Sequence, residues 1–237
     1  MADGRLYFLP ELRGRTRVFR DRAHAGAVLA GMLGELRGTD ALVLAVPAGG
    51  VPVAAELARR LDLPLDVAVV SKITLPWNTE AGYGAVAFDG TIRINEPLVA
   101  RAGLTARQVE AGIEETLAKV QRRVRALRGK RQPPRLAARL AVLVDDGLAS
   151  GFTMATAVAA LRRAGAGRLY VAVPTAHEEA VGRIAQGVDA VYVANLRSGP
   201  VFAVADAYRH WRDVSEDEAR RILQAAQGAA GGEPRDR

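Results

Sequence analysis

The stretch "LAVLVDDGLASGFTM", Leu140 to Met154, decides the fold class of this chain. Five apolar residues run directly into two adjacent carboxylates, Asp145 and Asp146, and small residues then lead into a helix-forming segment. A short apolar run followed by a helical pattern is typical of a βα unit in a parallel sheet. Because ligands bind beyond the carboxyl ends of such strands, the two acids mark a place where a ligand is expected.

The same alternation of apolar and amphipathic runs covers most of the chain. It indicates an α/β fold with a mostly parallel central sheet and helices on both faces. Strands are expected at residues 42–46, 65–70, 140–144, 169–173 and 190–193. Helices are expected at residues 51–61, 152–163 and 178–186, and the spacing of apolar residues over 21–38 predicts another helix before the first strand.

The middle of the chain interrupts this alternation. Residues 74–84, "TLPWNTEAGYG", lack periodicity and are rich in turn formers, and Asp89-Gly90 then lies between two short alternating runs, which predicts a hairpin. Thr105 followed by Gln108 predicts a capped long helix over residues 105–127. An irregular loop and hairpin at 74–95, inserted with a long helix between two core strands, is typical of a lid.

Length and composition set the domain organisation. The chain has 237 residues, 49% of them hydrophobic, and can therefore bury one sizeable core. We expect a single domain over residues 1–227. The tail at 228–237, "GAAGGEPRDR", has no apolar periodicity and is expected to be disordered.

Several classes of site are excluded by the residues that are missing. There is no cysteine, so disulfides, zinc–thiolate sites and cysteine nucleophiles are ruled out. His24, His177 and His210 stand apart from any metal-ligand spacing and fit surface or cap positions. No charge-free apolar run reaches the length of a membrane span, and the N-terminal residues lack an apolar signal core, so the sequence predicts a cytoplasmic protein.

The net charge of +7 comes mainly from arginine. No acid occurs between Thr116 and Val144, whereas basic residues accumulate from Arg122 to Arg139. Such a run can contact nucleic-acid phosphates. Because it lacks aromatic residues for stacking on bases, we interpret it first as a solvated helix face and loop, with nucleic-acid binding as the alternative.

The residues after the two acids suit a phosphate group. At the start of a helix, free N–H groups and the positive end of the dipole favour an anion, and small residues let it approach closely. Ser150 and Thr153 add hydroxyl donors to this segment. The two carboxylates accept hydrogen bonds, and the helix start that follows them donates. This order fits a sugar phosphate whose vicinal hydroxyls face the carboxylates and whose phosphate lies at the helix start. The plainer alternative is a capped helix in which the acids only complement the helix terminus.

The sequence "VLVDDGLASGFT" resembles the phosphoribosyl diphosphate (PRPP) binding signature of type I phosphoribosyltransferases. The resemblance implies the fold of that family, with its central sheet, an inserted lid region and a small hood. It also implies that Asp145 and Asp146 hold the ribose 2′- and 3′-hydroxyls and act in catalysis. The residues implied for the 5′-phosphate are Ala149, Ser150, Gly151, Phe152 and Thr153.

A second stretch, "LVLAVPAGGVPVAAELARRL", resembles the loop of the family that takes the pyrophosphate of PRPP. The implied contacts are backbone amides at Ala48, Gly49 and Gly50. Relatives often carry arginine where Ala48 stands, so this chain lacks a charged hydrogen bond of typically about 1.5 to 3 kcal/mol. Arginines within residues 13–22 and 122–139 are candidates to replace it, and the sequence places neither group.

Two more stretches extend the resemblance. "VVSKITLPWNTEAGYGAVAFDG" resembles the flexible catalytic loop, in which Lys72 would act on the pyrophosphate. In the same loop Trp77 and Tyr83 are candidates to cover the ribose or stack on a base, or else to pack on their own domain, and Glu80 is a lid residue without an assigned role. In the stretch "YVAVPTAH", which ends a later strand, Val173 and Thr175 would lie near the acceptor.

Together these stretches resemble the group of predicted phosphoribosyltransferases of bacteria and archaea, over about residues 19–218. This resemblance implies an enzyme that transfers the 5-phosphoribosyl group of PRPP to a nitrogenous base and releases pyrophosphate. The base itself is not identified. Mg²⁺ would be bound largely through PRPP, with no protein ligand assigned directly, and the protein would be a homodimer.

Two other functions stay open from the sequence. One is a non-catalytic regulator that senses PRPP or a nucleotide and binds RNA or DNA through its basic run. The other is a hydrolase or salvage enzyme that uses the same phosphate cradle for a different phosphosugar.

Overall fold

The computed structural model describes residues 5–129, 131–137 and 139–230, except for the side chains of residues 79, 80 and 227–230. Its centre is a parallel sheet with the strand order β1-β9-β8-β7-β2-β3. The strands are β1 (Arg5–Phe8), β2 (Leu42–Ala45), β3 (Leu65–Val67), β7 (Leu140–Val144), β8 (Arg168–His177) and β9 (Ala190–Arg197). The α/β fold class and the parallel sheet are therefore confirmed.

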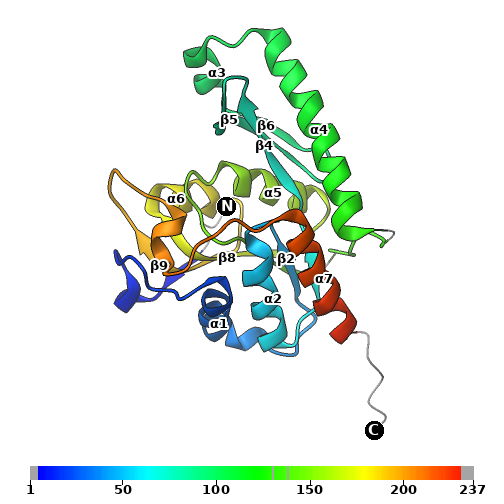
Figure 1. Ribbon diagram of the computed structural model, residues 1–237. Coiled ribbons are helices and arrows are strands. Elements are labelled where there is room, and N and C mark those ends of the chain that lie inside the picture. Colours follow the sequence, from blue (N-terminus) through cyan, green and yellow to red (C-terminus); the bar gives the residue numbers. More distant parts are fainter. Residues whose placement is uncertain (1–4, 130, 138, 231–237) are drawn as a thin grey trace.

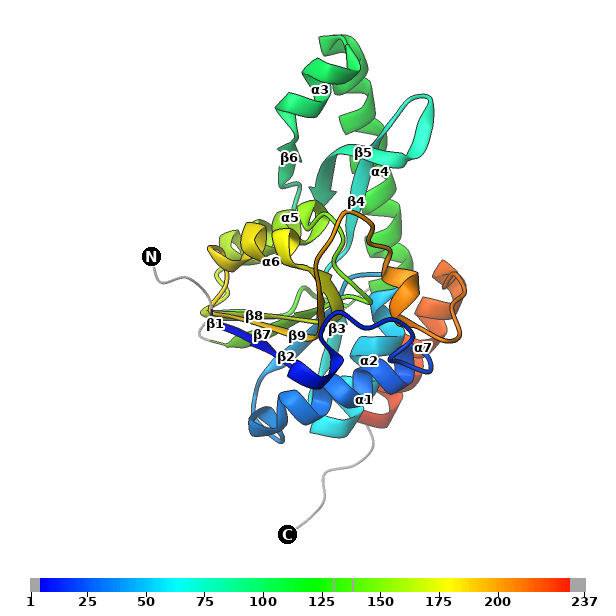
Figure 2. The same ribbon diagram turned by 90° about the vertical axis from the view of Figure 1, so that its left-hand side faces the viewer.

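Helices cover both faces of this sheet (Figures 1 and 2). One face carries α1 (Arg22–Met32), α2 (Gly50–Leu61) and α7 (Glu216–Ala230), and the other carries α5 (Phe152–Arg163) and α6 (Glu178–Ala185). Side chains alternate along β2, so that Val43 packs into one core and Leu44 into the other. Burial on both faces explains why β2 and β7 at the centre of the sheet are uninterrupted apolar runs.

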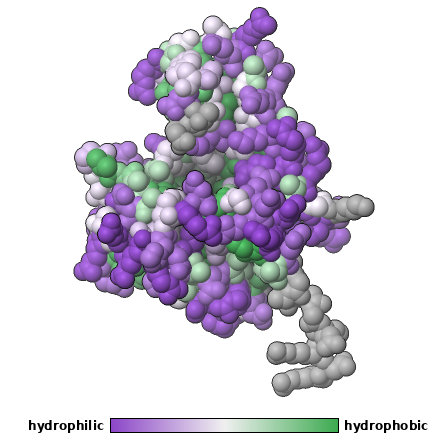
Figure 3. All heavy atoms as spheres, viewed as in Figure 1, coloured by the Kyte–Doolittle hydropathy of each residue, from purple (hydrophilic) through white to green (hydrophobic). Residues whose placement is uncertain are grey.

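A second unit, which we call the arm, comprises residues 70–128 and rises from the body beside α5 (Figure 1). It contains an antiparallel sheet in the order β4-β5-β6 and two helices. Its elements are β4 (Val70–Leu75), β5 (Asn78–Ala87), β6 (Ile92–Ile94), α3 (Glu96–Ala102) and α4 (Ala106–Arg128). The capping box predicted for the long helix is present at Thr105 and Gln108. Hydrophilic residues cover the α4 side of the arm (Figure 3).

The expectation of an irregular loop at residues 74–84 is wrong. β4 and β5 pair in a hairpin whose register shifts at Thr74 and Leu75, and these shifts break the alternation that marks a strand in sequence. Gly84 is required there, because an added Cβ would lie 2.9 Å from the backbone carbonyl oxygen of Arg93 on the neighbouring strand. The turn predicted at Asp89-Gly90 joins β5 to β6, with Gly90 at φ 85°.

Other boundaries also differ from the expectation. The strand expected at 65–70 is divided between β3 of the main sheet and β4 of the arm. β1 and α7 were not expected, and α7 includes residues 228–230 of the tail, while residues 231–237 lie outside the described part. The basic run is only partly a solvated face, because the guanidinium of Arg128 is buried and lies 2.9 Å from the Asp66 carboxylate.

Candidate active site

The two acids end β7 beside the loop that ends β2. Val144 and Ala45 are register partners, so residues 47–50 and the acids leave the sheet at the same edge. The loop lies very close to the acids. A Cβ on Gly49 would lie 2.1 Å from Oδ2 of Asp146, and a Cβ on Gly50 would lie 2.7 Å from the carbonyl oxygen of Val144. Glycine is therefore required at both positions. The peptide bond between Pro47 and Ala48, which lies between β2 and the two glycines, is cis.

Substitution of Gly50 by alanine is expected to destabilise the protein by roughly 1 to 3 kcal/mol, the usual cost of overpacking. The added methyl would meet backbone atoms of Val144 and Asp145, which cannot move aside as a flexible side chain can. Chemical denaturation measures the change in unfolding free energy. Gly31→Ala is the matched control, since nothing lies within 4 Å of its Cβ position in α1, and we expect it to stabilise by about 1 kcal/mol. Equal effects of the two changes would contradict the close approach.

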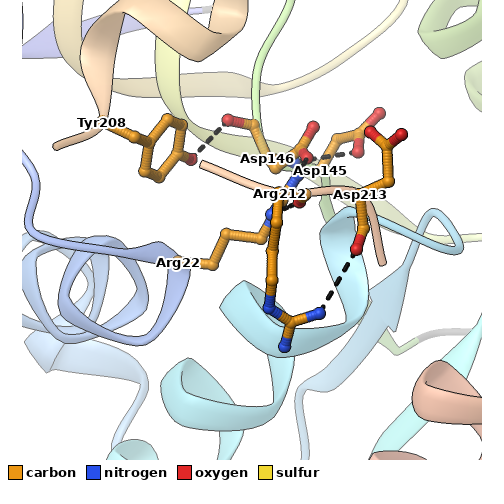
Figure 4. A network of polar contacts seen from close by, with 6 residues as sticks. All are labelled: Arg22, Asp145, Asp146, Tyr208, Arg212 and Asp213. Atoms are coloured by element: carbon orange, nitrogen blue, oxygen red, sulfur yellow. Dashed lines mark hydrogen bonds and ion pairs between the residues drawn. The ribbon is translucent and has the colours of Figure 1, made fainter. Parts of the chain in front are cut away.

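Asp146 is held by a buried arginine from α1 (Figure 4). Nε and Nη2 of Arg22 donate to Oδ2 of Asp146 at 2.9 and 2.8 Å, and Nη1 donates to the carbonyl oxygen of Arg212 at 2.7 Å. The side chains of Arg22 and Asp146 are 9% and 16% exposed. The pair is therefore largely withdrawn from solvent screening.

Residues 198–214, which we call the hood segment, pack over this pair. The hydroxyl of Tyr208 donates to the carbonyl oxygen of Asp146 at 2.6 Å, and the ring of Trp211 lies 3.9 Å from the guanidinium carbon of Arg22. Burial raises the pKa of Tyr208, so its hydroxyl stays protonated as a donor. Gly147 admits the side chain of Val204, which would lie 2.4 Å from an added Cβ.

The surroundings of Asp145 and Asp146 affect the pKa of each acid differently. Burial raises the pKa of Asp145 well above its ordinary value, and the charge of Asp146 raises it further. Burial also raises the pKa of Asp146, but the Arg22 guanidinium opposes that shift. A proton kept by the pair therefore resides preferentially on Asp145, and Asp146 carries the charge.

The segment after the acids forms the first turn of α5. Leu148 bridges to β8 through hydrogen bonds with Thr175 and His177, which fixes the path of the chain here. Gly151 has φ 72° and begins the helix, and Oγ of Ser150 accepts from the N–H of Phe152 at 3.3 Å. Ala149 and Ser150 are exposed. An exposed helix start with a hydroxyl beside it is a suitable place for an anion.

A cavity of about 310 Å³ joins these parts at the base of the arm. It brings together Asp145 from the end of β7, Thr153 from α5, Pro47 from the loop after β2 and Lys72 from β4. Three segments that are distant in the chain, around Pro47, around Lys72 and from Asp145 to Thr153, thus meet in one opening. Its remaining lining comprises Val46, Val70, Ser71, Thr74, Lys119 and Arg123.

Four residues with sequence-based roles at the lid or acceptor lie outside the cavity lining. Trp77 is 62% exposed in the turn between β4 and β5, whereas Tyr83 is 1% exposed and packs between β5 and α4. Val173 and Thr175 are fully buried, and the hydroxyl of Thr175 donates to Asn195. The Glu80 side chain lies outside the described part.

Three charged residues of the site were not singled out individually from the sequence. Arg22 falls within the first group of arginines considered as replacements for a cation in the 47–50 loop, but it binds Asp146. Arg123 falls within the second group and lines the cavity, as does Lys119. The spacing of four residues between Lys119 and Arg123 is the only sequence signal that they share a helix face.

The three histidines agree with the interpretation as surface or cap residues. His177 caps α6 by accepting from the N–H of Glu179, Nδ1 of His24 accepts from the N–H of Arg20, and His210 is exposed. Among the described residues no group of three or more acidic or histidine side chains could hold a metal ion. Within the same residues, no helix is long and apolar enough to cross a membrane.

Comparisons with known proteins identify the family of this chain. The model of the phosphoribosyl transferase domain matches residues 21–191. Two Mycobacterium tuberculosis proteins, from strains CDC 1551 / Oshkosh and H37Rv, are each named "Putative phosphoribosyl transferase" and are 38% identical to this chain over 210 residues. The match covers 89% of this chain and 47% of theirs, so the chain spans about half the length of these relatives.

A solved structure is also similar over nearly its full length. The crystal structure of TT1426 from Thermus thermophilus matches with a TM-score of 0.71 and 34% identity, over 87% of this chain and 98% of that one. The matching domain model and the sequence identity of these relatives establish the family. The chain belongs to the phosphoribosyltransferases.

Proposed function

We propose that this protein transfers the 5-phosphoribosyl group of PRPP, in the presence of Mg²⁺, to a nitrogenous base and releases pyrophosphate. The observation that carries the proposal is the cavity in which Asp145, Thr153 and Lys72 meet at the carboxyl edge of the sheet. It offers a carboxylate for a sugar hydroxyl, a helix start for a phosphate and a cation for a leaving group. A phosphorylated sugar with a second anionic group is complementary to all three.

The ribose is placed against the two acids. Their carboxylates accept hydrogen bonds from the vicinal hydroxyls and orient C1 for attack. As the bond from C1 to the pyrophosphate oxygen breaks, positive charge develops on C1 and the ring oxygen, and the charge on Asp146 stabilises it. Arg22 holds Asp146 in place without entering the cavity lining.

The 5′-phosphate is assigned to the segment from Ala149 to Thr153. The first turn of α5 supplies backbone N–H groups, and Thr153 reaches the same cavity as Asp145. The pyrophosphate is assigned to the other side, between the amides of residues 48–50 and Lys72. Backbone amides and a cation there stabilise the departing anion.

The residues of the cavity lining fit Mg²⁺ only if the substrate supplies most of the ligands of the ion. Mg²⁺ prefers oxygen ligands in octahedral geometry and commonly keeps few protein ligands. Asp145 is the one carboxylate among the described residues of the cavity lining, so it is the candidate protein ligand. When bound, the ion would neutralise part of the charge on the leaving group.

Water must be kept from the reactive sugar, and the hairpin of β4 and β5 is the candidate cover. Lys72 lies on β4 at the cavity, and Trp77 is exposed in the turn beyond it. Closure of the hairpin toward the sheet would bring Trp77 over the bound ribose or base. The acceptor is proposed to lie on the far side of the acids from the pyrophosphate, below the hood segment.

The proposed function is tested by incubating the protein with PRPP, Mg²⁺ and a panel of purine and pyrimidine bases while pyrophosphate release is followed. Release that depends on one base supports the transferase. Binding of PRPP without turnover on any base would favour a non-catalytic sensor, and release without a base would favour a hydrolase. A wild-type protein that does not bind PRPP would refute the proposal.

Replacing Lys72 by alanine is expected to lower kcat by a factor on the order of 100 while changing PRPP affinity much less. The reason is that this cation gains most of its interaction energy when charge develops on the leaving group. Steady-state kinetics and a direct binding measurement separate the two effects. Arg93→Ala is the control, since it removes an exposed cation of the arm that does not line the cavity. Loss of affinity with unchanged kcat would contradict this role.

A further inference from the structure

We propose that Lys119 and Arg123 of α4 bind the pyrophosphate end of the substrate and replace the cation that the 47–50 loop lacks. This inference rests on the proposed function and assigns further residues to the same site. It is carried by the presence of both residues in the lining of the cavity that Pro47 of the loop also lines.

The loop by itself offers no cationic side chain, since it consists of Pro47, Ala48, Gly49 and Gly50. It also packs directly on the acids, with Gly49 against the carboxylate of Asp146. A pyrophosphate on the loop amides therefore lies near negative charge, which repels it. Positive charge must come from another element for the anion to bind tightly.

α4 supplies that charge from the arm. Lys119 and Arg123 are four residues apart, so they project from the same face of the helix one turn apart. Both line the cavity together with Lys72, whereas Asp145 is the single acid among the described lining residues. Glu216 pairs with Arg123 from outside the lining, so these three cations face two carboxylates, and the remaining excess of positive charge around a space of about 310 Å³ favours a multiply charged anion.

Arg123 is fixed in position before any ligand binds. Its Nη1 donates to Oγ of Ser71 at 3.2 Å and to the carbonyl oxygen of Val70 at 3.4 Å, and its Nε donates to Glu216 at 3.0 Å. Its side chain is only 15% exposed. A guanidinium held in this way loses little further freedom when it binds an anion.

Lys119 contributes differently. It is exposed, so its ammonium group can follow the anion through the change from substrate to released pyrophosphate. Two nearby arginines of α4 show that not every cation of this helix lies at the cavity. Arg122 and Arg125 are exposed on the same helix and do not line the cavity.

Isothermal titration with two probes tests the inference, with Mg²⁺ present throughout. Inorganic pyrophosphate reports the leaving-group end, and ribose 5-phosphate reports the sugar and phosphate end. We expect Lys119→Ala and Arg123→Ala each to weaken pyrophosphate binding at least tenfold and to change ribose 5-phosphate binding less than twofold. Arg122→Ala, which removes the same charge from the same helix, should leave both affinities unchanged.

Two results would overturn the inference. One is unchanged pyrophosphate affinity in Lys119→Ala and Arg123→Ala, and the other is an equal loss in Arg122→Ala, which would indicate only a diffuse field. Arg123→Ala also removes contacts with Ser71 and Glu216 and could therefore change the fold. Lys119→Glu changes an exposed residue and is expected to keep the fold, which its thermal unfolding midpoint checks in parallel. Failure of the wild-type protein to bind either probe would instead refute the proposed function itself.

Discussion

Replacing Asp145 by asparagine is expected to weaken PRPP binding by a factor on the order of 10 to 100, and to stabilise the unliganded protein at pH 8. The loss of affinity follows because a hydrogen bond to a charged group contributes about 1.5 to 3 kcal/mol. The gain in stability follows because the partial burial of Asp145 and the charge of Asp146 both raise the pKa of Asp145 and oppose its ionisation. Asparagine has nearly the same shape and no charge.

The sign of the pH dependence is fixed by this shift. In the unfolded chain the carboxyl loses its proton near its ordinary pKa of about 3.9, whereas in the folded protein it keeps the proton to higher pH. Native stability therefore falls as pH rises from the unfolded pKa through the folded pKa. The advantage of Asp145→Asn is absent below about pH 4. It grows through that window and is complete above the folded pKa.

Thermal unfolding from pH 4 to pH 8 and PRPP titration measure both effects. We expect the midpoint to rise by at least about 2 °C at pH 8, where 1 kcal/mol corresponds to roughly 2 to 4 °C for a chain of this size. Asp213→Asn is the control, because it removes an exposed carboxylate of the hood segment near the site. Unchanged PRPP affinity in Asp145→Asn would remove this acid from the ribose site, and a lower midpoint at pH 8 would contradict the electrostatic account.

Substitution of Arg22 by alanine is expected to destabilise the protein by about 3 to 5 kcal/mol at pH 8, the usual cost of breaking a buried ion pair. It leaves the carboxylate of Asp146 without its partner in a site where only 16% of that side chain is exposed. It also removes the contact with Trp211 and the hydrogen bond to the hood segment. The pKa of Asp146 should rise, because the interaction that opposes its burial is gone.

The destabilisation should therefore shrink as pH falls toward 4 and Asp146 becomes protonated. The double variant Arg22→Ala with Asp146→Asn should recover part of the loss at pH 8. Arg59→Ala is the matched control, since its pair with Glu56 is 2.8 Å long but the arginine side chain is 67% exposed, and such pairs contribute about 0.2 to 1 kcal/mol. An equal loss for Arg22→Ala at pH 4 and pH 8 would show that packing rather than charge is responsible.

The central strands of the main sheet could be predicted from sequence because they are buried on both faces, whereas the exposed edge strand β1 was not expected. β7 and α5 have the expected boundaries, since an apolar run, two acids and a glycine before Phe152 leave little choice of where each element begins and ends. The arm could not be predicted as well. Its strands pair through shifted registers at Thr74 and Leu75, so the local pattern does not report the pairing.

The surroundings of the charged residues in the basic run could not be predicted from sequence either. Arg122 is exposed, Arg123 lines the cavity and Arg128 is buried against Asp66, although all three lie in the last two turns of α4. Helical geometry turns each residue by about 100° from the one before, so neighbours face different surroundings. The long helix was predicted, but its orientation against the sheet was not.

The sequence by itself determined the βα order, the place of the two acids after β7 and the small residues that open α5, because each depends on neighbours along the chain. Only the tertiary structure decided that Arg22 holds Asp146, and that Lys72, Lys119 and Arg123 surround one cavity with Asp145. Those relations depend on how the arm and the hood segment fold back onto the sheet. Residues 124 positions apart, such as Arg22 and Asp146, then become partners through contacts that no local pattern encodes.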